Sequence, residues 1–417
     1  MISRSQNNAH SQILLPPNEK KSIAGACTQQ SKKGSQLNVI PFPPMPPKIR
    51  AMLHEDWDIL DPKGSLMITA ISKLDGAVEF AHARSTFYDH LKGTFSLLSI
   101  WNQPEVVRRT GLVHTAYSGD LFQFYLFDSN DSGERAIVRD LLGEEAEALT
   151  YLFGTVDRGK LCHFKDVVER TRESATVPSG NQAVEQRGVG KLQVTPNEAA
   201  NLLIVSIADY MEQMVDTNGW KDHHQEEDGG EHLYPGDGRP GLGFYWFSSI
   251  CNAIKGSLDV TPHIFNHCET IISYESEKRA RDSYWKVISE ENALHEDDQM
   301  ALLKSCIINN EFVAEPHIML SQIYFRQGNY FDAATQAQMA LIKFYSLGTA
   351  WDKRRDYGHW VGFGRSLLLR SNRKMEEKIC SFPCTDPHDP LYTNHNGLKL
   401  TNLQHLVSEM RQREELM

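Results

Sequence analysis

Three polar residues that can bind a metal interrupt the apolar faces of predicted helices. His90 stands in the sequence Tyr-Asp-His-Leu, His114 in Gly-Leu-Val-His-Thr, and Asp209 in Ala-Asp-Tyr-Met-Glu. A polar side chain on an apolar helical face is expected to point into the protein. Two imidazoles and a carboxylate that meet inside a helical bundle form a site for a divalent metal such as Mn, Fe or Zn.

The two histidines also have a purely structural interpretation. A buried imidazole is stable without a metal when the backbone or a hydroxyl group satisfies its nitrogens. The hydroxyl of Thr115, next to His114, is one such partner. The sequence alone therefore leaves a metal site and a pair of core histidines as alternatives.

The chain around these residues has the pattern of an all-α protein. Apolar residues recur every three or four positions, without the sustained alternation of strands, in segments 86–101, 105–117, 134–153 and 197–215. Residues 51–274 are therefore predicted to form one helical domain that holds all three residues.

The same residues resemble the HD-domain metal-dependent phosphohydrolases, and among them most closely the hydrolase domain of guanosine tetraphosphate enzymes. His90 matches the first metal ligand, His114 the histidine of the His-Asp pair, and Asp209 the aspartate of the late Ala-Asp helix. The stretch 141–149 is similar to the helix between these motifs. An uncharacterised HD-like family, known only as a domain of unknown function, resembles the chain even more closely. Its members carry Asp-His-Leu, then Gly-Leu-x-His and a small hydroxyl residue; the resemblance covers residues 75–215.

Thr115 departs from the phosphohydrolase pattern, in which an aspartate follows the second histidine. A neutral hydroxyl is a poorer ligand for a hard cation than a carboxylate. Asp120 and Asp157 are the candidates for a catalytic carboxylate, and Arg84 is the candidate for binding a substrate phosphate through its forked guanidinium. Solvated or structural roles are the alternatives for these three residues.

A helical repeat is predicted after residue 275. Seven positions resemble the tetratricopeptide repeat, namely Ala314, Leu320, Tyr324, Gly328, Ala333, Ala340 and Leu341. The glycine allows a tight turn between two helices, and the alanines allow the helices to approach closely. One unit cannot bury its own apolar face, so tetratricopeptide-like hairpins are predicted over 275–372.

Charge and composition restrict the function and the location. The chain has 417 residues and a net charge of −11, which disfavours a protein that coats nucleic acid or an anionic membrane. Residues 1–50 are predicted to be a disordered, proline-rich arm with a net charge of +6. A cytoplasmic protein is expected, and an organelle transit peptide in the arm is the alternative. Residues 373–417 are predicted to be an irregular tail with a terminal helix.

Two functions of different classes follow. The first is a degenerate metal-dependent hydrolase that acts on a phosphorylated small molecule or nucleotide. The second is a non-catalytic scaffold that binds a protein partner through the helical repeats. Iron-dependent oxidation is a third possibility, because related helical folds also host oxygenases.

Overall fold

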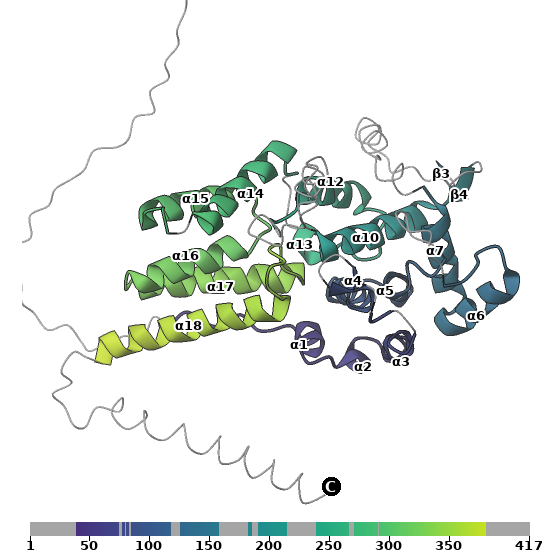
Figure 1. Ribbon diagram of the computed structural model, residues 1–417, viewed down its shortest axis with the longest axis horizontal. Coiled ribbons are helices and arrows are strands. Elements are labelled where there is room, and N and C mark those ends of the chain that lie inside the picture. Colours follow the sequence, from purple (N-terminus) through teal and green to yellow (C-terminus); the bar gives the residue numbers. More distant parts are fainter. Residues whose placement is uncertain are drawn as a thin grey trace, which may run out of the picture. The chain divides into compact units, whose positions relative to one another are not determined.

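The computed structural model describes residues 39–74, 77–79, 81–82, 85–117, 126–157, 182–185, 191–214, 239–266, 271–290 and 292–380, all within one compact unit (Figure 1). The fold is all-α, as predicted. The helices before residue 215 are α1 (Pro47–Leu53), α2 (Trp57–Leu60), α3 (Pro62–Ile71), α4 (Phe87–Ile100), α5 (Glu105–Leu112), α6 (Ser132–Leu142), α7 (Glu144–Thr155) and α10 (Pro196–Gln213). The later helices are α12 (Phe244–Ile254), α13 (His263–Asn266), α14 (Tyr274–Ser289), α15 (Glu296–Asn309), α16 (Glu315–Arg326), α17 (Tyr330–Leu347) and α18 (Tyr357–Cys380).

Two short antiparallel strand pairs accompany the helices. Strand β1 (Ala81–His82) pairs with β2 (Ser85–Thr86), and β3 (Gln182–Glu185) pairs with β4 (Lys191–Val194). Each pair precedes one of the helices that carry the candidate ligands, because β2 runs directly into α4 and β4 ends one residue before the N-cap of α10.

The four predicted helical segments are confirmed, but one of them is divided into two helices and another ends earlier than predicted. The segment 134–153 is divided into α6 and α7 at Gly143, whose φ of 94° is a left-handed value that favours glycine. The segment 105–117 ends as a helix at Leu112, so His114 lies just beyond the C-terminus of α5.

Helices α4 and α10 begin at strong N-caps. The Thr86 hydroxyl accepts a hydrogen bond from the backbone N–H of Asp89, and Thr195 and Glu198 form a reciprocal capping box. Most side chains of α10 are buried around its whole circumference, so α10 is a central helix that packs against α4, α5, α7 and α12.

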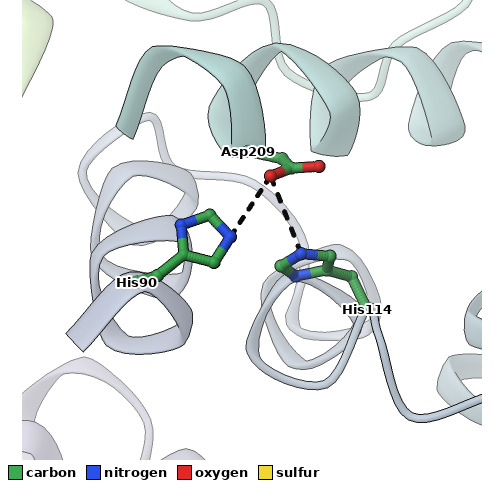
Figure 2. A group of neighbouring side chains, drawn as sticks. All are labelled: His90, His114 and Asp209. Atoms are coloured by element: carbon green, nitrogen blue, oxygen red, sulfur yellow. Dashed lines mark ion pairs between the residues drawn. The ribbon is translucent and has the colours of Figure 1, made fainter. Parts of the chain in front are cut away.

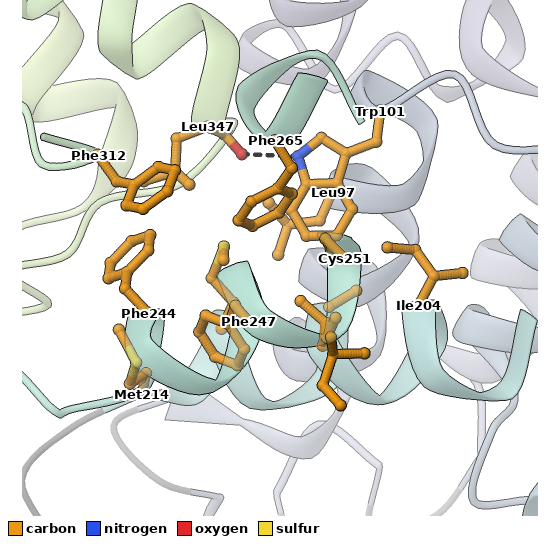
Figure 3. Packing of buried hydrophobic residues seen from close by; sticks show 14 of the residues in the cluster. Leu97, Trp101, Ile204, Met214, Phe244, Phe247, Cys251, Phe265, Phe312 and Leu347 are labelled. Atoms are coloured by element: carbon orange, nitrogen blue, oxygen red, sulfur yellow. Dashed lines mark hydrogen bonds between the residues drawn. The ribbon is translucent and has the colours of Figure 1, made fainter. Parts of the chain in front are cut away.

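The largest hydrophobic cluster crosses residue 274, the predicted end of the first domain (Figure 3). Phe244 of α12 stacks on Phe312 with ring centroids 5.2 Å apart, and both rings are buried. Trp101 donates from its indole nitrogen to the Leu347 carbonyl at 3.0 Å. The helices on the two sides of residue 274 therefore share one core.

The predicted arm is wrong over its last residues. Residues 47–50 form the start of α1, and the Ile49 side chain is completely buried against α16–α18. Proline at the first helical position fits the start of α1, since a proline there loses no helical hydrogen bond. Residues 1–38, which hold most of the predicted arm and of the alternative transit peptide, lie outside the described residues.

The predicted tail is likewise wrong at its beginning, because α18 continues to Cys380. The terminal helix predicted near residues 400–415 lies outside the described residues. Within the described ranges, no helix is long and apolar enough to cross a membrane.

Helices α14 to α18 pack in chain order, each against the next (Figure 1). Gly328 has a φ of 74° in the turn between α16 and α17, as the predicted tight turn requires. Ala333 and Ala340 are fully buried, which allows α17 to lie close to its neighbours. In the described residues, α14 to α18 thus form a succession of packed helices, and their identity as tetratricopeptide-like repeats stays a prediction.

Candidate metal centre

The structure brings His90, His114 and Asp209 together (Figure 2). One ligand atom from each residue lies within 4.8 Å of the other two. The Asp209 Oδ1 atom is 3.2 Å from Nε2 of His90 and 3.7 Å from Nε2 of His114. The exposed fractions are 2% for His90, 1% for His114 and 6% for Asp209, so the group is almost completely buried.

His90 is fixed by a second carboxylate on α10. Its Nδ1 lies 2.5 Å from Oε2 of Glu212, while its Nε2 faces Asp209. Asp209 and Glu212 are three residues apart and so lie on the same face of the helix. A histidine that donates its Nδ1 proton to a carboxylate presents Nε2 to the centre of the site.

His114 is fixed by its own backbone. Its Nδ1 is 2.8 Å from the Gly111 carbonyl, one of the terminal carbonyls of α5 that lack a partner within the helix. A Cβ atom at Gly111 would lie 2.3 Å from Cδ1 of Leu98, so a larger residue there would have to displace the Leu98 side chain of α4. The Gly-Leu-Val-His sequence therefore both leaves space for Leu98 and orients the imidazole.

The rings around the site support this orientation. The His90 and His114 rings meet edge to face with centroids 5.3 Å apart, and His114 meets Phe153 of α7 in the same way at 5.4 Å. The apolar ring of Phe153 is itself buried. Hence α4, α5, α7 and α10 all contribute to the centre.

Burial and two carboxylates act in opposite directions on the pKa of His90. Burial lowers the pKa, while the hydrogen bonds and charges of Asp209 and Glu212 raise it, and the result is a pKa of about 9. Without a metal, His90 is therefore protonated at neutral pH and bridges the two carboxylates. A metal that binds at Nε2 takes the place of one proton.

Two of the three separations between donor atoms are close to those of a transition-metal site. Bonds of about 2.1 Å from a metal to imidazole nitrogen or carboxylate oxygen place neighbouring ligand atoms roughly 3.0–3.4 Å apart. The separations of 3.2 Å and 3.7 Å between Asp209 and the two imidazoles are close to this range. Two nitrogens and one oxygen suit Mn, Fe or Zn, and three protein ligands are typical of catalytic sites.

The other predicted site residues lie elsewhere or outside the description. Asp157 follows the end of α7 and is partly exposed, and it does not belong to the group of three. Asp89, which precedes His90 in the sequence, is likewise outside the group, because Thr86 and Lys92 bind its carboxylate. Arg84 and Asp120 lie outside the described residues.

Glu212 is the residue of the candidate site that the sequence interpretation missed, and it contacts His90. Its signal was its position three residues after Asp209, on the same helical face. Gly93 was also missed. A Cβ atom there would lie 2.5 Å from Cγ of Glu212, so the absence of a side chain at Gly93 leaves space for Glu212. Only the packing of α10 on α4 reveals either role.

Comparisons with known proteins identify one domain. A family described as a domain of unknown function (DUF6817) matches residues 72–158, which include His90 and His114 but not Asp209. No curated protein and no solved structure matches the chain. The match covers about one fifth of the chain and carries no assigned activity.

Proposed function

We propose that the protein is a metal-dependent phosphohydrolase that acts on a phosphorylated small molecule or nucleotide. The observation that carries the proposal is the convergence of both Nε2 atoms and Asp209 Oδ1 at one buried point, with each Nδ1 already hydrogen-bonded. The resemblance to HD-domain phosphohydrolases supplies the class of reaction.

Each residue of the centre has a distinct task in this proposal. His90, His114 and Asp209 hold the ion, and Glu212 accepts the Nδ1 proton of His90 and so keeps its Nε2 lone pair directed inward. A divalent metal held by these residues would supply Lewis-acid chemistry toward a phosphoryl oxygen and would lower the pKa of a bound water.

The experiment is a screen of phosphomonoesters and nucleotides with the protein loaded separately with Mn, Fe or Zn. Turnover is expected with wild type and with His54→Ala, which removes an exposed histidine, and a loss of at least a hundredfold is expected for His114→Ala. Equal turnover by wild type and His114→Ala would contradict the proposal.

A second function is supported by a separate observation, the succession of hairpins from α14 to α18. We infer that these helices bind a protein partner, as stacked helical repeats commonly do. The expected result is a partner interaction that persists in His90→Ala and His114→Ala and is lost in Gly328→Pro. Loss of the interaction in all three variants would contradict an independent role for the repeats.

A further inference from the structure

Residues 39–46, which precede α1, have no helix or strand and lie across α17 and α18. The Asn372 side chain accepts a hydrogen bond from the backbone N–H of Ile40 at 3.1 Å and donates one to the Ile40 carbonyl at 2.9 Å. Gln338 donates to the next carbonyl, that of Pro41, at 2.8 Å. Two side-chain amides thus hold three consecutive polar groups of the main chain.

Side chains of the segment also contact this surface. The guanidinium of Arg365 lies 5.2 Å from the ring centroid of Phe42 and donates to the hydroxyl of Tyr345 at 3.2 Å. Ile40 and Met45 pack on the core cluster of α16–α18. We name Gln338, Tyr345, Arg365 and Asn372 the amide–arginine surface.

These contacts are those by which proteins hold extended peptides. A paired amide recognises any main chain with a free N–H and C=O, and an arginine over an aromatic ring adds selectivity. Proline-rich sequence favours the extended conformation before binding, and Pro46 has the φ of −57° and ψ of 141° of that conformation.

Side chains of residues 39–46 are more exposed than the core-facing side chain of α1, the helix that follows. The exposed fractions of Val39 and Phe42 are 38% and 37%, but that of Ile49 in α1 is zero. Residues 39–46 are therefore less deeply buried than α1. Asn372 is itself 5% exposed, and its side-chain amide makes two hydrogen bonds to the segment that covers it.

We propose that the amide–arginine surface is a binding site for an extended proline-rich segment of a partner protein, and that residues 39–46 occupy it in cis. The partner segment carries an apolar residue with a free N–H at the position of Ile40, then proline, an aromatic residue and further prolines. The proposal rests on the second proposed function, the binding of a partner by the helical repeats, and adds the ligand class and its internal competitor.

Tethering makes the competition measurable. A segment linked to its site by a few residues has an effective concentration of about a millimolar or more. A free peptide of the same sequence must therefore bind wild type much more weakly than a variant whose own segment is released. Ile40→Pro removes the N–H that donates a hydrogen bond to Asn372, and Phe42→Ala removes the aromatic ring that Arg365 contacts.

The experiment titrates a fluorescein-labelled peptide with the sequence of residues 39–46 into the full-length protein and follows fluorescence anisotropy. The Ile40→Pro/Phe42→Ala variant is expected to bind at least tenfold more tightly than wild type and the control Val39→Ala. Adding Asn372→Ala to that variant is expected to weaken binding at least tenfold, and a peptide with proline at the Ile40 position is expected not to bind.

Two results would overturn the proposal: no binding to the released variant, or binding that is unchanged by Asn372→Ala. Thermal unfolding shows whether the double variant is folded, and if it is not, Phe42→Ala alone at its half-exposed site provides the same comparison. A repeat-dependent partner that is captured while the peptide fails to bind would refute this site and leave the broader binding function standing.

Discussion

The carboxylate of Glu212 lies 2.5 Å from Nδ1 of His90, on the opposite side of the imidazole from Asp209. This arrangement of carboxylate, histidine and metal-facing nitrogen is the usual support of a metal ligand. The two partners differ in burial, because Asp209 is 6% exposed whereas the Glu212 side chain is 21% exposed. The pair is the support that the proposed metal centre requires.

Glu212→Gln tests this relationship. Glutamine keeps a hydrogen-bond acceptor at nearly the same place but removes the negative charge, so metal affinity should fall by roughly 10- to 100-fold while the fold is retained. Competition with a chelating dye measures the affinity. An affinity equal to that of wild type would show that Glu212 does not support the ligand.

Gly93→Ala tests the same support from α4. The added methyl group would lie 2.5 Å from Cγ of Glu212, so the carboxylate must move away from His90 and metal binding should weaken. The same chelator competition measures it. Retention of full affinity would mean that Glu212 adapts without loss.

Gly362→Ala is the matched control in α18. Nothing lies within 4 Å of a Cβ atom at this exposed helical glycine. Alanine should therefore stabilise the protein by about 0.5–1 kcal/mol through its better helix propensity, with metal affinity unchanged. Urea unfolding measures the free energy, and a destabilised variant would contradict the open packing around Gly362.

A buried histidine in α16 predicts a pH dependence of stability. Burial lowers the pKa of His317 to about 4; the hydrogen bond that its Nδ1 donates to Oε1 of Gln336 raises the pKa, and the charge of Lys343 lowers it. A folded-state pKa below the unfolded value of 6.5 means that stability is complete above pH 6.5 and is lost as the pH falls toward 4.

His317→Gln removes this titration. Between pH 7 and pH 4.5 wild type should lose about 2–3 kcal/mol more unfolding free energy than the variant. Urea unfolding of both proteins at the two pH values gives the loss of unfolding free energy in each. The contributions of all other titrating groups are common to both proteins and cancel when the two losses are subtracted. Parallel losses in the two proteins would show that His317 is not buried in its neutral form.

The sequence predicted the parts of the fold that depend on local pattern. Apolar spacing located α4 and α10, and polar residues on their apolar faces located His90 and Asp209. The division between α6 and α7 was missed because glycine at position 143 is compatible with a helix until its positive φ is known.

Long-range packing could not be read from the sequence. A proline-rich segment indicates an extended chain, but nothing local indicates that Ile40 pairs with Asn372, 332 residues away. Glu212 presented the same difficulty, because an acid near a helix end is usually solvated. Its role depends on the distance between α10 and α4, which Gly93 sets.

The most direct test of the metal centre is elemental mass spectrometry of the purified protein after incubation with Mn, Fe or Zn and removal of free ions. Near-stoichiometric metal is expected in wild type and in His54→Ala, and its loss is expected in His90→Ala, His114→Ala and Asp209→Ala, each checked for folding by circular dichroism. A folded wild-type protein that takes up no metal, or three variants that all retain it, would contradict the account.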